Sequence, residues 1–188
     1  MLKYIEEFGK YVAITGLSEA RIGSIEEFFK LIRKEKQSNV EIQFFDAKLV
    51  ATWQHLYFAV LNALTAFKNQ RNISKSLAME TMLYASAQRQ IRKATQIMGL
   101  KPNTSEIAVL IIGEKEETVK TALQPVMENV DAKQNSTVLE LSKEKTALIQ
   151  KVFGISNVEL EAVIGREGLE KALVNLVIER MALLTTQR

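Results

Sequence analysis

The sequence contains no cysteine, only two prolines, one histidine and one tryptophan among its 188 residues. Without cysteine the chain has no disulfide framework, no thiolate metal ligand and no thiol nucleophile. A chain without disulfides fits a reducing compartment, so we expect a cytoplasmic protein. The composition, 47% hydrophobic and 25% charged, is ordinary for a globular chain of a length that can bury a sizeable core.

Long apolar runs are also missing. No uninterrupted apolar stretch approaches the roughly 18 to 20 residues that are needed to cross a bilayer. The N-terminal segment MLKYIEEFGKYVAITG is too charged to resemble a secretory signal peptide. We therefore expect a soluble protein without a membrane partner.

The motifs that mark common catalytic and cofactor sites are absent as well. The sequence has no glycine-rich phosphate loop, no nucleophile elbow and no HExxH zinc motif. His55 has no neighbouring histidine, cysteine or aspartate, which favours a structural or solvent-exposed histidine over a metal ligand. The paired carboxylates of Glu26 with Glu27 and of Glu116 with Glu117 are expected on solvent faces of helices. We expect no metal, no cofactor and no catalytic residue.

Apolar spacing predicts a helix-rich mixture of helices and strands. Apolar residues at three- and four-residue steps predict helices, whereas alternating or short continuous apolar runs predict strands. The expected strands cover residues 2–8, 10–15, 40–45 and 107–112. The expected helices cover residues 25–32, 47–70, 77–86, 88–98, 115–130, 142–153, 156–163 and 167–184.

Local signals add detail to this outline. Asp46 is the expected N-cap of the helix over 47–70, and Pro125 is expected to break or end the helical pattern over 115–130. Residues 131–137 are predicted to form a flexible loop, and the continuous apolar run over 107–112 suits a strand buried on both faces. No linker or repeat interrupts the chain, so residues 1–188 are expected to form a single domain. Its class is α/β (an α+β mixture), with a small mixed β-sheet and several helices packed around it.

Charge is distributed unevenly along the chain. Residues 47–105 hold eight lysines and arginines and a single acid, Glu80, for a net charge of +7, whereas the rest holds 17 bases and 21 acids, for a net charge of −4. The stretch RNISKSLAMETMLYASAQRQIRKATQIMG, residues 71–99, interleaves these bases with hydrogen-bonding side chains. Chance clustering on a solvated face is one explanation. A basic middle in an otherwise acidic chain favours a polyanion partner, with nucleic acid ahead of membrane.

One constellation in this stretch could form an active site. Glu80 and Tyr84 are four residues apart on one helix face, with Ser86 and Arg89 nearby, and these groups could perform acid–base chemistry. As the only acid among many bases, Glu80 more simply orients an arginine or a lysine. The same residue types suit binding, because arginine and lysine hold phosphate oxygens while glutamine, serine and tyrosine can contact an unpaired strand.

The last expected helix carries two apolar stripes. Leu169, Leu173, Leu176, Val177 and Leu184 form one stripe, and Val174, Ile178 and Met181 form the adjoining one. One stripe is enough for a helix that lies on a core. The second stripe indicates either a surface for a partner or deep burial in the chain's own core, and the sequence leaves both open.

The runs SKSLAMETMLYASAQRQIRKATQIMGL, IAVLIIG and KVFGIS…EKALVNLVIERMALL resemble the small non-catalytic subunit of the KEOPS (EKC) complex, also called the PRPK-binding protein family. The similarity covers essentially the whole chain, and its motif comprises Glu80, Leu83, Tyr84, Ser86, Arg89, Gln90 and Ile91. The resemblance implies an α/β subunit of the machinery that makes threonylcarbamoyladenosine next to the anticodon of tRNA. In that family the subunit performs no chemistry, binds the single-stranded 3′ CCA end of tRNA and docks on the atypical kinase/ATPase subunit.

The resemblance also implies site residues. The candidates for RNA contact are Lys68, Arg71, Lys75, Arg89, Gln90, Arg92 and Lys93, and the candidates for kinase docking are Val174, Val177, Ile178 and Met181. Ala87 departs from the family pattern, because many members carry glycine after the motif serine, and an added methyl would alter a nucleotide pocket there. No DNA partner is expected. The alternatives are a small enzyme that uses Glu80 and Tyr84, or a protein–protein adaptor without RNA contact.

Overall fold

The computed structural model describes residues 1–35, 39–165 and 168–185, which form two compact units that are interleaved along the sequence. Unit 1 comprises Met1–Ala47 and Gly99–Val138, and unit 2 comprises Lys48–Met98 and Leu139–Arg188. Unit 1 holds the sheet and unit 2 is helical, so the predicted mixture of helices and strands is confirmed. That residues 1–188 form a single domain stays a prediction.

The described strands are β1 (Leu2–Ile5), β2 (Lys10–Ser18), β3 (Val40–Asp46), β4 (Ile107–Gly113) and β5 (Lys133–Gln134). The described α-helices are α1 (Ile25–Glu35), α2 (Trp53–Lys68), α3 (Leu77–Ala85), α4 (Ile91–Met98), α5 (Glu116–Thr121), α6 (Leu123–Val130), α7 (Lys143–Phe153), α8 (Asn157–Val163) and α9 (Gly168–Ala182). Glu167, the expected first residue of the last helix, lies outside the described residues.

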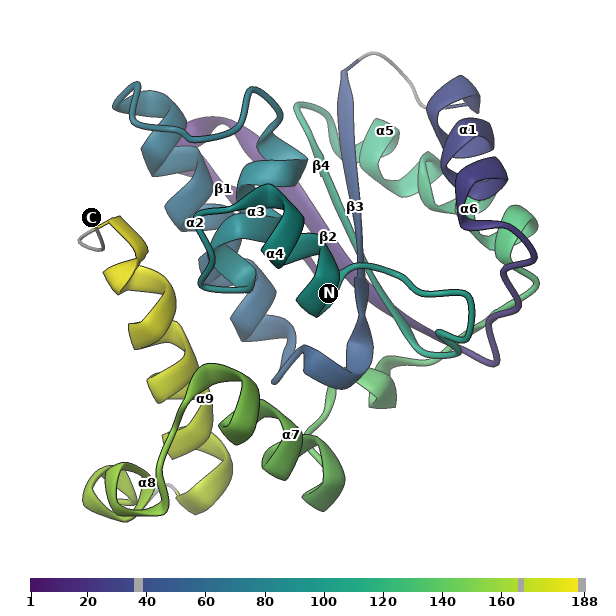
Figure 1. The fold of residues 1–188 in the computed structure, drawn as a ribbon. Helices are drawn as coiled ribbons and strands as arrows, with labels where there is room; N and C mark the ends of the chain where they lie inside the picture. Colours follow the sequence, from purple (N-terminus) through teal and green to yellow (C-terminus); the bar gives the residue numbers. More distant parts are fainter. Residues whose placement is uncertain (36–38, 166–167, 186–188) are drawn as a thin grey trace. The chain divides into compact units, whose positions relative to one another are not determined.

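The sheet of unit 1 has the strand order β1-β2-β4-β3, and β5 pairs with β2 (Figure 1). Every strand pair in the described part of the chain is antiparallel, so the sheet is antiparallel where a mixed sheet was expected. β1 and β2 form a hairpin whose turn ends at Gly9, with a left-handed φ of 60° that glycine adopts at little cost.

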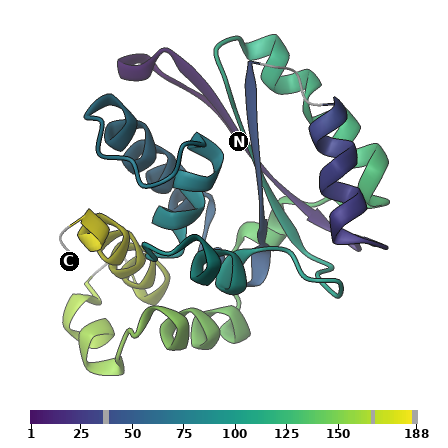
Figure 2. The same cartoon turned by 45° about the horizontal axis from the view of Figure 1, so that its top comes forward.

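The central strand β4 anchors the core of unit 1. All seven of its residues are buried, as its continuous apolar run predicted. Ile107, Val109 and Ile111 join a cluster with residues of α1, α5 and α6, including Phe28 and Val126. Figures 1 and 2 show α1 and α6 side by side on this face of the sheet. Because side chains alternate along a strand, these three residues share one face.

The core of unit 2 forms where its helices meet. α2 contacts α3 and α9, and α9 also contacts α7 and α8. The buried cluster draws Ile149 and Phe153 from α7, Leu160 from α8, and Leu173, Leu176 and Val177 from α9.

A capping box starts α8 in unit 2. The Glu159 carboxylate accepts bonds from the Ser156 N–H and hydroxyl and from the Arg180 guanidinium. These bonds, the Ser156 N–H first, lower the pKa of Glu159 to about 2. The Arg180 bond thereby ties the start of α8 to α9.

The structure corrects the expected start of the long helix. Asp46 is the last residue of β3, where it pairs with Ile107, and the Ala47 N–H extends the pairing by donating to Glu106 O at 3.0 Å. α2 begins only at Trp53, after the extended residue Thr52. Asp46 is therefore not the N-cap of α2, because six residues, three of them in the 3-10 turn Ala47–Leu49, separate it from Trp53.

Two further expectations change in unit 1. The helical pattern over 115–130 divides at Ala122 into α5 and α6, and Pro125 lies in the first turn of α6 instead of ending a helix. Proline is tolerated there because the first turn has no carbonyl partner for its missing N–H. The predicted flexible loop over 131–137 contains β5, and Asn135 N–H donates to Gly16 O at 2.8 Å.

In the part of the chain that the structure describes, none of the helices combines the length and the apolar character that crossing a membrane requires.

We predict that Gly113→Ala destabilises unit 1 by about 1–3 kcal/mol, since overpacking in a tight site forces neighbours to move. A Cβ at Gly113 would lie 2.8 Å from Val119 Cγ2 and 3.5 Å from Thr118 Oγ1. Urea unfolding of the full chain measures the loss. Gly23→Ala is the matched control, because no atom lies within 4 Å of its added Cβ. Equal stability of the two variants would contradict the prediction.

Candidate functional site

The seven residues predicted to contact RNA all lie in unit 2, and the side chain of each is exposed. The loop group, which comprises Lys68 at the last residue of α2 and Arg71 and Lys75 in the link between α2 and α3, precedes α3. The α4 group, Arg89, Gln90, Arg92 and Lys93, follows α3. The nine residues of α3 span about 13 Å at 1.5 Å per residue. The seven residues therefore form two groups that flank α3 along the chain, one before its first residue and one after its last.

The end of α2 fixes the start of the loop group. Gln70 adopts a left-handed φ of 54°, and its N–H donates to Phe67 O at 3.1 Å. The Arg71 N–H donates to Ala66 O at 2.9 Å, which completes a Schellman motif. The backbone position of Arg71 is thus set by α2.

Glu80 fixes the rest of the link between α2 and α3. Its side chain is fully buried, and Oε2 accepts hydrogen bonds from the N–H groups of Ile73 at 2.9 Å and Ser74 at 2.7 Å. From its place among many bases, Glu80 was expected to orient an arginine or a lysine. Its hydrogen-bond partners are instead backbone amides, so Glu80 organises the loop from inside.

The end of α3 sets the start of the α4 group. The Ala87 N–H donates to Tyr84 O at 2.9 Å and the Gln88 N–H donates to Leu83 O at 3.0 Å, a second Schellman motif. Ala87 has a left-handed φ of 50°, a conformation in which a Cβ costs energy and glycine is favoured. This backbone conformation by itself would favour glycine at position 87, independent of any nucleotide pocket.

The residues of the acid–base alternative are largely enclosed. Glu80 is 0% exposed, Tyr84 4% and Ser86 2%. The Ser86 hydroxyl donates to Met82 O at 2.8 Å within its own helix. Burial and then the Glu80 charge raise the pKa of the Tyr84 phenol, while Arg89 opposes this shift. The motif residues Glu80, Tyr84 and Ser86 thus form the interior support of the site, and the exposed chemistry is basic.

α4 presents bases at its N-terminal end. Ala94 and Met98 are buried, whereas Ile91, Arg92 and Lys93 are exposed in the first turn, which contains no acid. Arg89, just before the helix, donates from Nη1 to Leu184 O at 3.4 Å. A helix N-terminus carries partial positive charge, so this turn concentrates positive potential.

The predicted kinase-docking residues do not share one surface. Val177 and Met181 are fully buried, Val174 is largely buried and Ile178 is half-buried. Val177 comes from the first stripe and lies in the apolar cluster of unit 2. In the second stripe Met181 and Val174 are buried as well, so burial in the chain's own core, the alternative left open by that stripe, accounts for these two. Neither Val177 nor Met181 is accessible to a partner.

Val174 and Ile178 instead line a groove of about 460 Å³ together with Phe58 of α2. Phe58 is 38% exposed. Phe58 was not among the predicted docking residues. The signal that could have identified it is an apolar residue outside the periodic core stripe of its helix. The groove lies within unit 2, and its lining is completed by the polar or charged residues Thr52, Gln54, Glu170, Lys171 and Asn175.

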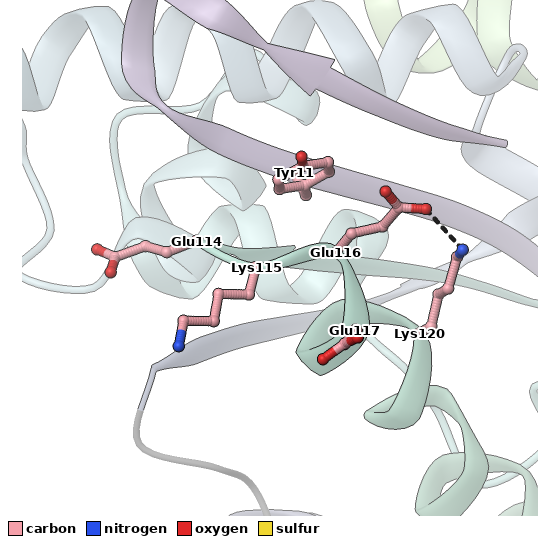
Figure 3. Close-up of a pocket in the computed structure, with 6 residues that line it drawn as sticks. All are labelled: Tyr11, Glu114, Lys115, Glu116, Glu117 and Lys120. Carbon is pink, nitrogen blue, oxygen red and sulfur yellow. Dashed lines mark ion pairs between the residues drawn. The ribbon is translucent and has the colours of Figure 1, made fainter.

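A second hollow, of about 500 Å³, lies in unit 1 (Figure 3). Its charged lining mixes signs, and Glu116 pairs with Lys120 at 2.6 Å. Figure 3 shows the carboxylates of Glu114, Glu116 and Glu117 pointing in different directions. Among the residues that the structure describes, no three histidine, cysteine or acidic side chains are grouped to hold a metal ion. Glu116 and Glu117 are exposed, as predicted.

His55 is structural, one of the two roles that the sequence favoured. Its ring is fully buried, Nδ1 accepts from the Ala51 N–H at 3.2 Å, and Nε2 donates to Ala85 O at 2.8 Å. Burial lowers the pKa of His55 to about 4, the bond to Ala85 O opposes this shift, and the Lys145 charge adds to it. The neutral ring links the start of α2 to the end of α3.

We predict a pH-dependent stability that originates at His55. The unfolded chain protonates this ring near pH 6.5, whereas the folded chain keeps it neutral down to about pH 4. The free energy of unfolding should therefore fall as the pH drops from 6.5 to 4, by about 2 kcal/mol between pH 7 and pH 5. Urea unfolding at both values measures this loss. The His55→Gln variant has no titratable group at this position, so its free energy of unfolding should fall much less between pH 7 and pH 5. An equal fall in both chains would refute the assignment of the pH dependence to His55.

Comparison with known proteins identifies the family. The family described as Kinase binding protein CGI-121 matches residues 21–185. The chain is also 34% identical over 142 residues to the Regulatory protein Cgi121 of Methanocaldococcus jannaschii, covering 76% of this chain and 83% of that protein. These matches confirm the family resemblance drawn from the motif around α3. The chain therefore belongs to the CGI-121 family of kinase binding proteins.

Proposed function

We propose that this protein is a non-catalytic subunit of the KEOPS complex, which forms threonylcarbamoyladenosine at position 37 of tRNA. In this proposal unit 2 binds the single-stranded 3′ CCA end of tRNA and docks on the atypical kinase/ATPase subunit, in the cytoplasm. Membership of a family of kinase binding proteins supports the kinase partner. The name of the archaeal relative, a regulatory protein, supports a role without catalysis.

One observation carries the RNA proposal. The motif residues divide by exposure, since Glu80, Tyr84 and Ser86 are buried while every predicted RNA contact is exposed. Arginine and lysine side chains at both ends of α3 can each hold phosphate oxygens. A surface on which the bases are exposed, with the one acid of this stretch buried, suits a polyanion ligand.

The charge at the start of α4 adds to this argument. Helices favour acids in the first turn, because the N-terminal end of the helix dipole is positive. α4 has Arg92 and Lys93 there and no acid. A phosphate group bound at this end would neutralise both the side chains and the dipole. The unfavourable placement of the two bases is thus explained by an anionic ligand.

Exposed apolar side chains among the bases favour an unpaired strand over a duplex. Ile73, between Arg71 and Lys75, is 41% exposed, and Ile91, beside Arg92, is 46% exposed. Single-stranded RNA offers base faces to apolar side chains and phosphates to cations, whereas a duplex hides its base faces. The pairing of isoleucines with cations therefore suits a single-stranded end.

The groove beside α9 is the proposed kinase contact. Val174 and Ile178 are the two predicted docking residues that line it, and Phe58 adds an exposed aromatic ring from α2. Exposed aromatic anchors in apolar grooves dominate the binding energy of many protein interfaces.

We predict that removal of the 3′ CCA end weakens tRNA binding by about tenfold or more, which corresponds to at least 1.4 kcal/mol. Fluorescence anisotropy with intact and truncated tRNA measures the difference. The double substitution Lys75→Ala with Arg92→Ala should also weaken binding and should reduce the salt dependence by about one released counterion for each cation. Lys151→Ala, an exposed lysine on α7, is the control. Equal binding of both tRNAs would mean that the surface binds RNA through non-specific charge and does not recognise the CCA end.

We predict that Phe58→Ala weakens kinase binding by about 2 kcal/mol, the size typical of an aromatic anchor. Calorimetry with the purified kinase subunit measures the change. Leu148→Ala is a matched control, since Leu148 is 39% exposed on α7 and lies outside the lining of the groove. Loss of affinity in the control variant alone would place the docking surface on α7.

A further inference from the structure

The link between α2 and α3 is held by hydrogen bonds along its whole length. The α2 Schellman motif holds Arg71, and Glu80 holds Ile73 and Ser74. The Asn72 Nδ2 donates to Ser74 O at 3.0 Å, and the Ser74 Oγ accepts from the Ser76 N–H at 3.2 Å. The Ser76 Oγ accepts from the Met79 N–H at 3.3 Å, which caps α3. A polar link of this composition would otherwise sample many conformations.

We propose that Glu80 is a positioning residue for RNA, which acts by holding the link in the conformation that presents Arg71 and Lys75. The inference rests on the proposed function and adds a role that the basic residues do not suggest. Glu80 is fully buried, so it cannot itself touch the RNA. By ordering the backbone before binding, it removes an entropy cost that the RNA contact would otherwise carry.

The cost of burying Glu80 supports a functional role. A buried carboxylate is unfavourable unless its oxygens are hydrogen-bonded. Oε2 has two N–H donors, but Oε1 is buried and receives no hydrogen bond from the residues that the structure describes. An apolar residue would stabilise the interior more simply. The carboxylate is explained by the two backbone N–H groups of the link that it holds. Buried polar groups with incomplete hydrogen bonding concentrate at functional sites.

Charge alone predicts the opposite effect of Glu80. It is the single acid among the eight bases of residues 47–105. A negative charge near a polyanion site weakens binding, so a purely electrostatic role predicts that removing the charge tightens RNA binding. A positioning role predicts that a side chain too short to contact the Ile73 and Ser74 amides weakens RNA binding, whether or not it is charged. The two roles can therefore be separated by substitutions that change reach and charge independently.

Glu80→Asp and Glu80→Gln make this separation. Aspartate keeps the charge but is one methylene shorter, so it releases the Ile73 and Ser74 N–H groups. Glutamine keeps the length and one acceptor oxygen but loses the charge. We expect Glu80→Asp to weaken binding to a tRNA ending in CCA by about tenfold, the factor for ordering one or two residues on binding. We expect Glu80→Gln to stay within about threefold of the unsubstituted chain.

Amide hydrogen exchange supplies a readout that is independent of RNA. The Ile73 and Ser74 amides should exchange faster in Glu80→Asp than in Glu80→Gln, while amides inside α2 and α3 keep their protection. Unchanged exchange and unchanged RNA affinity in Glu80→Asp would overturn the inference, as would tighter binding by Glu80→Gln alone. Lys75→Ala separates this failure from failure of the proposed function. If Lys75→Ala and the unsubstituted chain bind RNA equally, the RNA proposal fails even where the exchange result holds.

Discussion

The hydrogen bonds from the Ile73 and Ser74 amides to the buried Glu80 carboxylate tie the link between α2 and α3 to the interior of unit 2. Arg71 and Lys75 lie on this link, and their separation from each other depends on its backbone. The acid is inside and the bases are outside, so the basic surface keeps its charge while its geometry is fixed. A loop held in this way meets a flexible ligand with little loss of its own entropy.

The same logic recurs at the other ends of the helices around this surface. His55 joins the start of α2 to the end of α3 through two hydrogen bonds. Gln70 and Ala87 take left-handed conformations that end α2 and α3 within one or two residues of the predicted contacts. On the link, the backbone at Arg71, Ile73 and Ser74 is hydrogen-bonded to α2 or to Glu80, while the basic side chains that the link carries are exposed. Binding residues on an ordered backbone suit the RNA-binding role that we propose for this surface.

The pattern of the sequence predicted most elements, and the errors arise where pairing between distant residues decided the structure. β4 was recognised because a continuous apolar run marks a strand buried on both faces. The start of α2 was misplaced, because Asp46 is a good N-cap by type but pairs with Ile107 in the sheet. β5 was missed, since Lys133 and Gln134 form a strand only through pairing with β2. Those pairings join residues far apart in the chain, which no local pattern records.

For the site, the sequence by itself determined the chemistry: a basic stretch with one acid, and a motif that marks its family. Composition and spacing carry this information because charge and residue type are properties of the chain. Only the tertiary structure decided which of those residues face outward. It turned Glu80, Tyr84, Val177 and Met181 inward, and it exposed Phe58 and Ile73. The physical reason is that burial depends on neighbours that packing brings together. Of two residues with similar positions in the sequence pattern, one can therefore be buried and the other exposed.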